Sequence, residues 1–286
     1  MVAGLIDKVA VIGAGTMGNG IAQTFAMSGA KVSLIDVDKE IVSKGLAAIR
    51  SSLDRFVKKG TLTQEQANES AMRVSGNWEL GPAMGASLVV EAVVEKIEVK
   101  RKVFSELDQI CGPSTILATN TSSISITAIA ASTKRPDKVI GMHFMNPVPL
   151  MKLVEVIRGQ ETSDETTARV VACAEALGKV PVQANDYPGF VSNRVLMPMI
   201  NEAVFCLMEG VATREGIDTV MSLGMNHPMG PLALADLIGL DVCLDILEVL
   251  HEGLGDDKYR PCPLLRRMVA AGRLGRKVKR GFYDYA

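Results

Sequence analysis

The chain has 286 residues, of which 48% are hydrophobic and 22% charged, and its formal net charge at pH 7 is −1. These values are typical of a folded globular protein with one large or two ordinary domains. The lack of a basic surplus argues against nucleic acid as a partner. The five cysteines are scattered without a C-x-x-C pair. Their spacing argues against a metal knuckle or a disulfide framework, predicts no metal site, and favours a reducing compartment.

The N-terminus and the hydropathy pattern indicate where the protein is located. The first predicted strand begins within ten residues of Met1, which leaves no room for a signal or transit peptide. No window approaches the roughly 18 uncharged apolar residues that a membrane span requires. We therefore expect a cytoplasmic protein with no membrane partner.

A glycine-rich turn lies between two predicted strands near the N-terminus. The apolar run 8–12 reads as a buried strand, Gly13-Ala14-Gly15-Thr16-Met17-Gly18 follows it, a helix is predicted next, and the second strand covers 31–35. In such a turn the first glycine permits the tight bend, the second lets the backbone approach a pyrophosphate, and the third lets helix and strand pack closely. The free N–H groups at the helix N-terminus meet the pyrophosphate. The sequence therefore predicts a dinucleotide site.

Asp36 ends the second strand and indicates which dinucleotide binds. It lies 18 residues after Gly18, and its carboxylate can hydrogen-bond a ribose 2′-hydroxyl. A 2′-phosphate would meet this negative charge, and the next acid is Asp38 rather than an arginine. Lys39 is a weak counterargument. The sequence therefore favours NAD over NADP.

Strands and helices alternate through the first two-thirds of the chain. Beyond the opening unit, a helix is predicted over 97–110, and strands are predicted over 87–93, 115–119, 138–144, 153–157 and 180–183. This alternation predicts an α/β fold with a Rossmann-type, doubly wound, mostly parallel sheet. The segment 39–73 is too long for a plain crossover and reads as a helical hairpin. The hairpin is either an insertion without function or an arm that reaches over the active site.

Asp186-Tyr187-Pro188-Gly189 is the predicted domain boundary, because a Pro-Gly turn follows the last predicted strand. An NAD-binding domain then covers residues 1–186, and an all-helical C-terminal domain covers residues 187–286. Its predicted helices cover 190–208, broken or kinked near Pro198, then 213–221 and 263–271, and the segment 233–250 is strongly apolar. Helices that are apolar on most sides are usually buried. We expect this domain to close the active site or to mediate oligomerisation.

Ligands of open parallel sheets bind beyond the carboxyl ends of the strands. The polar residues at the predicted strand ends are Glu91, Glu95, Asn120, Ser122, His143 and Asn146. Of the three histidines only His143 lies at such an end, and histidine exchanges a proton near neutral pH, as oxidation of an alcohol by NAD requires. Glu155, inside the apolar run 153–157, is the predicted carboxylate that orients His143. The alternative for Glu155 is an edge-strand carboxylate that faces water.

Several longer motifs occur together in this chain. They include Asn120-Thr121-Ser122-Ser123, His143-Phe144-Met145-Asn146-Pro147, Leu153-Val154-Glu155-Val156, the run from Asp186 to Arg194, Gly230-Pro231 and Gly281-Phe282-Tyr283. With the glycine turn, this set resembles the (S)-3-hydroxyacyl-CoA dehydrogenases over essentially the whole length. The resemblance is strongest to the short bacterial members that act on 3-hydroxybutyryl-CoA.

The resemblance implies a role for each matched residue. His143 would be the acid/base on the 3-hydroxyl or 3-keto oxygen, and Glu155 would hold and charge-stabilise its imidazole. Ser122 would hydrogen-bond the substrate oxygen close to the nicotinamide. Asn193 would polarise the thioester side and tie the domains together. NAD would be bound by the glycine turn, Asp36, Glu95, Lys100, Asn120, Ser122, Asn146 and Lys277.

The resemblance also gives the predicted hairpin a purpose. Ser52 and Lys59 fall where the family contacts coenzyme A, and lysines there suit its phosphates. Lys58 reads equally well as a solvated lysine. Near the C-terminus, Val278-Lys279 replaces a Thr-Gly pair that is common in the family. This replacement makes the loop stiffer and leaves open whether Lys277 reaches the cofactor. A homodimer through the C-terminal domain is implied as well.

The expected activity is the reversible, NAD-dependent oxidation of an (S)-3-hydroxyacyl-CoA to the 3-ketoacyl-CoA, with 3-hydroxybutyryl-CoA as the expected substrate. Two alternatives remain. A β-hydroxyacid dehydrogenase with a lysine base would act on free acids, and a non-catalytic NAD-binding protein would bind nucleotide without hydride transfer. The presence of Ser122, His143, Glu155 and Asn193 together argues against the second alternative.

Overall fold

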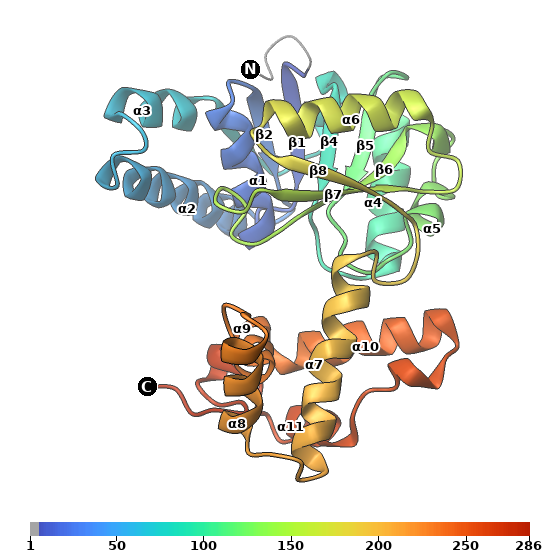
Figure 1. The fold of residues 1–286 in the computed structure, drawn as a ribbon. Coiled ribbons are helices and arrows are strands. Elements are labelled where there is room, and N and C mark those ends of the chain that lie inside the picture. The colour runs from blue at the N-terminus through green and yellow to red at the C-terminus, as the bar shows by residue number, and fades with distance from the viewer. Residues whose placement is uncertain (1–5) are drawn as a thin grey trace. The chain divides into compact units, whose positions relative to one another are not determined.

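The computed structural model describes residues 6–286, which form two compact units. One unit ends at Asp186, and the other covers Tyr187–Ala286. The first unit is built from strands and helices, and the second is helical (Figure 1). The predicted fold class is confirmed.

Eight strands form one sheet in the order β3-β2-β1-β4-β5-β6-β7-β8. All neighbouring strands are parallel except β6 and β7, which are antiparallel. The strand order reverses between β1 and β4, where ligands of doubly wound sheets bind. The strands are β1 (Lys8–Ile12), β2 (Lys31–Ile35), β3 (Val74–Asn77), β4 (Leu88–Glu91), β5 (Ile116–Thr119), β6 (Val139–Phe144), β7 (Leu153–Arg158) and β8 (Val180–Asn185).

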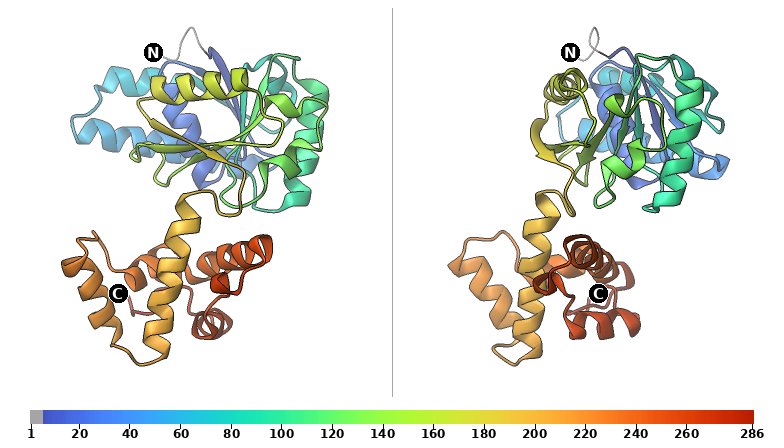
Figure 2. Two further views of the ribbon diagram at one scale, coloured as in Figure 1. Left: turned by 45° about the vertical axis from the view of Figure 1, so that its right-hand side comes forward. Right: turned by 90° about the vertical axis from the view of Figure 1, so that its right-hand side faces the viewer.

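Helices cover both faces of this sheet. One buried apolar cluster joins residues of α1 (Thr16–Met27) and α6 (Asp164–Ala176) to the strands. Figure 2 shows α4 (Ile97–Ile110) on the face opposite to α6. The short helix α5 (Ile126–Ala130) follows β5. This layering leaves the carboxyl ends of the strands as the place where loops and side chains can form a site.

Besides short 3-10 helices, one strand and two α-helices of the first unit were not predicted from the sequence. The strand β3 has the sequence Val-Ser-Gly-Asn, which carries little β propensity and lies at the edge of the sheet. The other two are α5 and α6. For α6 a signal was present, because Ser163 accepts a hydrogen bond from the Thr166 N–H and two acidic residues follow in the first turn.

The segment after β2 forms the predicted helical hairpin (Figure 1). Its two helices are α2 (Lys39–Lys58) and α3 (Gln64–Met72). Asp38 caps α2 by accepting the N–H of Glu40 at 2.7 Å. Thr63 and Gln66 form a capping box at the start of α3. Helix α2 buries a single stripe of residues, which are Val42, Gly45, Ile49 and Leu53. The other faces of the helix are therefore available for further contacts.

The second unit contains α7 (Ser192–Met208), α8 (Arg214–Thr219), α9 (Pro231–Ile238), α10 (Leu240–Leu254) and α11 (Pro263–Ala270). Helix α7 is not broken at Pro198, because buried residues on both sides of the proline hold one continuous helix. The apolar segment 233–250 is divided between α9 and α10. Gly239 separates them with a φ of 109°, a value that disfavours other residues. Within residues 6–286, no helix is both long and apolar enough to span a bilayer.

Candidate active site

The glycine-rich turn joins the carboxyl end of β1 to α1. Gly13 has a φ of +101°, and a Cβ atom there would lie 2.5 Å from the carbonyl oxygen of Ala92. A Cβ atom at Gly18 would lie 1.7 Å from the carbonyl oxygen of Gly13. Both positions therefore require glycine for steric reasons. At Gly15 a Cβ atom would meet no protein atom within 4 Å, so the space beside this backbone is open to a ligand.

The start of α1 fits a pyrophosphate group. Gly15 is the N-cap residue and provides no side-chain hydrogen bond. The first N–H groups of a helix have no partner inside it, so a phosphate can accept from them. Asp36 accepts the N–H of Ala14 at 2.9 Å, which fixes its carboxylate beside the turn. The chain thus presents phosphate donors and a ribose acceptor together, as a dinucleotide requires.

The antiparallel pairing of β6 and β7 places His143 directly opposite Glu155. The distance between His143 Nδ1 and Glu155 Oε2 is 2.8 Å, and Nε2 of the same ring lies 3.1 Å from Ser122 Oγ. The two residues are 7% and 2% exposed. Strand β7 lies between β6 and β8, so the alternative of an edge-strand carboxylate facing water is wrong. A carboxylate at Nδ1 orients the ring and leaves Nε2 to exchange a proton.

Glu95 fixes the turn that carries Ser122. Its Oε1 atom accepts the backbone N–H groups of Ser122 at 2.9 Å and of Ser123 at 3.2 Å. It also accepts the hydroxyl of Thr121. One carboxylate oxygen therefore holds three consecutive residues and sets the direction in which the Ser122 hydroxyl points.

Asn120, at the end of β5, joins this turn to β6. Its side-chain oxygen accepts the backbone N–H of Phe144 at 2.8 Å, one residue beyond His143. Asn120 is 8% exposed. The hydrogen bond fixes the carboxyl ends of β5 and β6 relative to each other, so it supports the contact between Ser122 and His143.

Lys100 is 1% exposed and lies behind Glu95. Its ammonium group is 2.7 Å from Glu91 Oε1 and 3.2 Å from Glu95 Oε2. Glu91 is fully buried and also accepts the hydroxyl of Thr119 at 2.7 Å. In this structure Lys100 therefore faces two carboxylates, and it acts on the Ser122 turn through Glu95.

The environment of Glu95 has opposing effects on its carboxyl group. Burial raises the pKa of Glu95, whereas the Lys100 ammonium and the hydrogen bonds from Thr121 and Ser122 lower it. The net result is a pKa below the ordinary carboxyl value. Glu95 is therefore ionised near neutral pH and holds the turn as a charged acceptor.

The buried Glu91–Lys100 pair was not foreseen, although the sequence carries a signal for it. Lys100, Phe104 and Leu107 are the buried residues of α4, and they follow the i, i+4, i+7 spacing of one helix face. A lysine on the apolar stripe of an amphipathic helix needs a buried acidic partner. Glu91, at the end of the neighbouring apolar strand, was the candidate.

Three further predicted binding residues belong to the first unit: Ser52, Lys59 and Asn146. Ser52 is half-buried in α2, and Lys59 is exposed at the end of that helix. Asn146 is exposed just after β6. These positions leave Lys59 and Asn146 accessible to ligands.

Two predicted residues belong to the second unit. Asn193 lies in the first turn of α7 and is 8% exposed. The ammonium of Lys277 lies 2.6 Å and 2.5 Å from the two carboxylate oxygens of Asp241. Lys277 is therefore engaged in an ion pair within its own unit.

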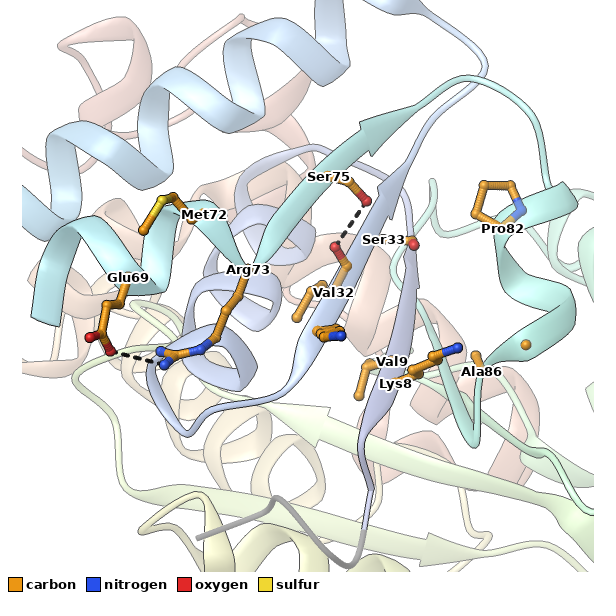
Figure 3. Close-up of a pocket in the computed structure, with 12 residues that line it drawn as sticks. Lys8, Val9, Val32, Ser33, Glu69, Met72, Arg73, Ser75, Pro82 and Ala86 are labelled. Atoms are coloured by element: carbon orange, nitrogen blue, oxygen red, sulfur yellow. Dashed lines mark hydrogen bonds and ion pairs between the residues drawn. The ribbon is translucent and has the colours of Figure 1, made fainter.

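A cavity of about 580 Å³ lies at the opposite end of the strands (Figure 3). Lys8 and Lys31 line it at the amino ends of β1 and β2, and Arg73 lines it just before β3. Arg73 forms an ion pair with Glu69, which Figure 3 marks with a dashed line. The distance between Arg73 Nη2 and Glu69 Oε2 is 3.0 Å. Ligands of parallel sheets bind beyond the carboxyl ends instead. This cavity is therefore separate from the candidate active site.

Two family models match the chain almost end to end. Residues 8–187 match the 3-hydroxyacyl-CoA dehydrogenase, NAD binding domain, and residues 189–285 match the 3-hydroxyacyl-CoA dehydrogenase, C-terminal domain. The chain belongs to the 3-hydroxyacyl-CoA dehydrogenase family. It is an NAD-dependent oxidoreductase, which confirms the predicted family, enzyme class and cofactor, and an acyl-CoA substrate is consistent with this family.

Several proteins match this member of the 3-hydroxyacyl-CoA dehydrogenase family over nearly the whole of both chains. A Bacillus subtilis protein named "Probable 3-hydroxybutyryl-CoA dehydrogenase" is 59% identical over 98% of both chains. A Bradyrhizobium diazoefficiens protein named 3-hydroxybutyryl-CoA dehydrogenase is 53% identical over 99% of this chain and 97% of its own. The crystal structure of (S)-3-hydroxybutyryl-CoA dehydrogenase from Ralstonia eutropha superposes with a TM-score of 0.96 at 51% identity, covering 98% of this chain and 99% of that one.

Proposed function

We propose that this enzyme interconverts (S)-3-hydroxybutyryl-CoA and acetoacetyl-CoA, with His143 as the acid/base. The observation that carries the proposal is the line of contacts from Glu155 through His143 to Ser122, at 2.8 Å and 3.1 Å. The names of relatives that are 53% and 59% identical support the four-carbon substrate.

The proposed mechanism routes the proton through named atoms of the chain. In the oxidation, Nε2 of His143 takes the proton of the substrate 3-hydroxyl, and in the reduction it returns the proton to the same oxygen. Glu155 keeps the ring oriented and stabilises the positive charge that the ring gains. Ser122 donates a hydrogen bond to that oxygen. NAD, when bound, supplies the hydride chemistry at the substrate carbon.

The other roles are proposed from position and chemistry. The glycine turn and Asp36 bind NAD, because they provide phosphate donors and a ribose acceptor. Asn146 and Lys277 complete the NAD contacts, and Lys277 would exchange its Asp241 partner for the cofactor. Lys59 with Ser52 binds coenzyme A, since an exposed lysine suits phosphates. Asn193 polarises the thioester carbonyl.

We also propose a homodimer that forms through the second unit. An apolar cavity of about 430 Å³ lies between α7, α8 and α9, and the residues that line it include Met199, Val211 and Ile217. Val195 and Leu223 are 68% and 82% exposed in the same unit. Exposed apolar surface of this kind marks interaction sites. Light scattering tests the dimer, and a monomer at micromolar concentration would refute it.

The cytoplasm is the proposed compartment. All five cysteines are free, and four of them are buried with their thiol pKa values raised by burial: Cys111, Cys173, Cys243 and Cys262. Thiols that form no disulfide are typical of a reducing compartment. Fractionation of cells that express the tagged protein tests this location.

One assay tests the proposed activity against both alternatives. NADH absorbance should fall with acetoacetyl-CoA and stay constant with free acetoacetate. Turnover of free acetoacetate would support a β-hydroxyacid dehydrogenase instead. Tight NADH binding without loss of absorbance would support a non-catalytic binding protein.

A further inference from the structure

Lys179 is a buried lysine that the proposed mechanism does not use. It is 8% exposed and immediately precedes β8. Its ammonium donates hydrogen bonds to the carbonyl oxygens of Val148 at 2.6 Å and Met151 at 2.7 Å. Both of these partners are neutral, and burial lowers the pKa of Lys179 from the ordinary lysine value. Burying a charged group costs free energy, which raises the question of what the two hydrogen bonds of Lys179 contribute to the protein.

The two carbonyl groups belong to the loop that joins β6 to β7, residues 145–152. The loop begins two residues after His143 and ends three residues before Glu155. It therefore connects the two strands whose register brings the acid/base and its carboxylate together. Lys179 binds this loop at two points, three residues apart. Any shift of the loop would be transmitted to the pair.

The same loop is in contact with the helix that follows the glycine turn. A Cβ atom at Gly20 of α1 would lie 3.0 Å from Cβ of Val148, which is 2% exposed. Helix α1 and the loop thus pack closely at the residue whose carbonyl Lys179 holds. Asn146, a proposed NAD ligand, lies two residues before Val148. The loop connects the proposed NAD site to the His143–Glu155 pair.

We propose that Lys179 is a positioning residue that holds the β6–β7 loop in the form needed for NAD binding and for proton transfer. An ammonium group has three donors, so one side chain can hold two carbonyl groups, and charged donors make stronger hydrogen bonds than neutral ones. The role rests on the proposed function, because it presumes that Asn146 contacts NAD and that His143 moves the proton.

The test compares Lys179→Met with Lys152→Met. The first change keeps the length of the side chain and removes its charge and donors, and the second makes the same change at an exposed lysine of the same loop. For Lys179→Met we expect a severalfold higher Kd for NAD. We also expect a fall in kcat of about tenfold or more, since a misplacement of about 1 Å can cost about 10²-fold. Lys152→Met should have the same Kd for NAD and the same kcat as the wild type.

Hydrogen exchange provides a readout that does not depend on turnover. The N–H groups of Leu150 and Met151 both bond to the carbonyl oxygen of Pro147 at 3.0 Å. Lys179→Met should speed exchange at these two amides and leave α10 unchanged. If Lys179→Met does not fold, Lys179→Gln, which keeps an N–H donor without the charge, should show the same changes.

A merely structural role predicts a different pattern. Lower thermal stability with unchanged NAD affinity, kcat and loop exchange would overturn the role of Lys179. The role of Lys179 would also be overturned if Lys152→Met changed NAD affinity, kcat and loop exchange as much as Lys179→Met does. A wild-type enzyme that does not reduce acetoacetyl-CoA would refute the proposed function instead, while NAD affinity and loop exchange would still decide the role of Lys179.

Discussion

His143 and Glu155 face each other across the one antiparallel strand pair of the described sheet, with 2.8 Å between Nδ1 and Oε2. The antiparallel register of β6 and β7 is what sets His143 directly opposite Glu155. Cross-strand partners lie side by side on one face of a sheet, so the pairing of β6 with β7 brings the two side chains together. The proton-transfer group therefore stands on rigid elements, and Ser122 approaches it from the adjacent turn.

His143→Gln removes the group that exchanges the proton and keeps a side chain of similar polarity. We expect kcat to fall by about 10²–10⁴-fold, the usual contribution of general acid–base catalysis. The Kd for NADH should stay within about twofold, because His143 is not among the proposed NAD contacts. Steady-state assays and NADH fluorescence titration measure the two quantities. Near-normal turnover would remove His143 from the mechanism.

Glu155→Gln keeps the shape of the carboxylate and removes its negative charge. The protonated imidazole then loses its stabilising partner, so kcat should fall by an amount comparable with that in His143→Gln. The oxidation requires the neutral ring, and its pH–rate curve should rise at a lower pH than in the wild type. An unchanged curve would count against the pairing of these residues in catalysis.

Gly15→Ala tests the phosphate-binding surface without disturbing the fold. Its Cβ atom would meet no protein atom within 4 Å, so stability should change little, whereas the methyl group would occupy the space proposed for the pyrophosphate. We expect the Kd for NAD to rise by about tenfold or more, equivalent to about 1.4 kcal/mol. Gly85→Ala is the matched control, because a Cβ there is also unobstructed. Equal NAD affinity in both variants would place the dinucleotide elsewhere.

Glu95→Gln tests how the ionised carboxylate holds the Ser122 turn. The folded-state pKa of Glu95 is lowered from the ordinary glutamate value, so the ionised group stabilises the native state near neutral pH and this effect is lost as pH falls through the lowered pKa. The wild type should therefore be more stable than the variant at pH 7, and the difference should shrink as the carboxylate becomes protonated at acidic pH. Denaturant unfolding across pH 3–7 measures it, with Glu79→Gln, an exposed carboxylate, as control. A difference independent of pH would exclude this role.

Local patterns were enough to predict much of the first unit. The glycine turn, Asp36 and the strand ends are each determined by residues close in sequence, and the structure places them in one αβ unit with the expected sterics at Gly13 and Gly18. The strand 74–77 was missed because a Val-Ser-Gly-Asn edge strand has almost no local signal. Its pairing with β2 comes from the sheet as a whole.

Contacts between residues far apart in sequence could not be predicted in the same way. Lys100 was expected to line the cofactor site, and its ion pairs with Glu91 and Glu95 were not part of that prediction. The direction of a long charged side chain depends on which acids the fold brings near it. Lys277 shows the same effect, because Asp241 lies 36 residues away in sequence and holds its ammonium group.

Lys59→Met tests whether the helical hairpin contacts coenzyme A. Lys59 is exposed at the end of α2, and an exposed ion pair contributes about 0.2–1 kcal/mol, which corresponds to a rise of up to about fivefold in the KM for acetoacetyl-CoA. The kcat and the KM for NADH should not change, since neither depends on the CoA phosphates. Lys44→Met, at an exposed lysine on the same helix, should behave as the wild type.

Salt provides a second test, because it screens exposed charges with a Debye length of about 10 Å at 0.1 M. The difference in KM between Lys59→Met and the wild type should therefore become smaller as salt is added. A KM that is unaffected at low salt would leave the hairpin without a role in substrate binding through Lys59.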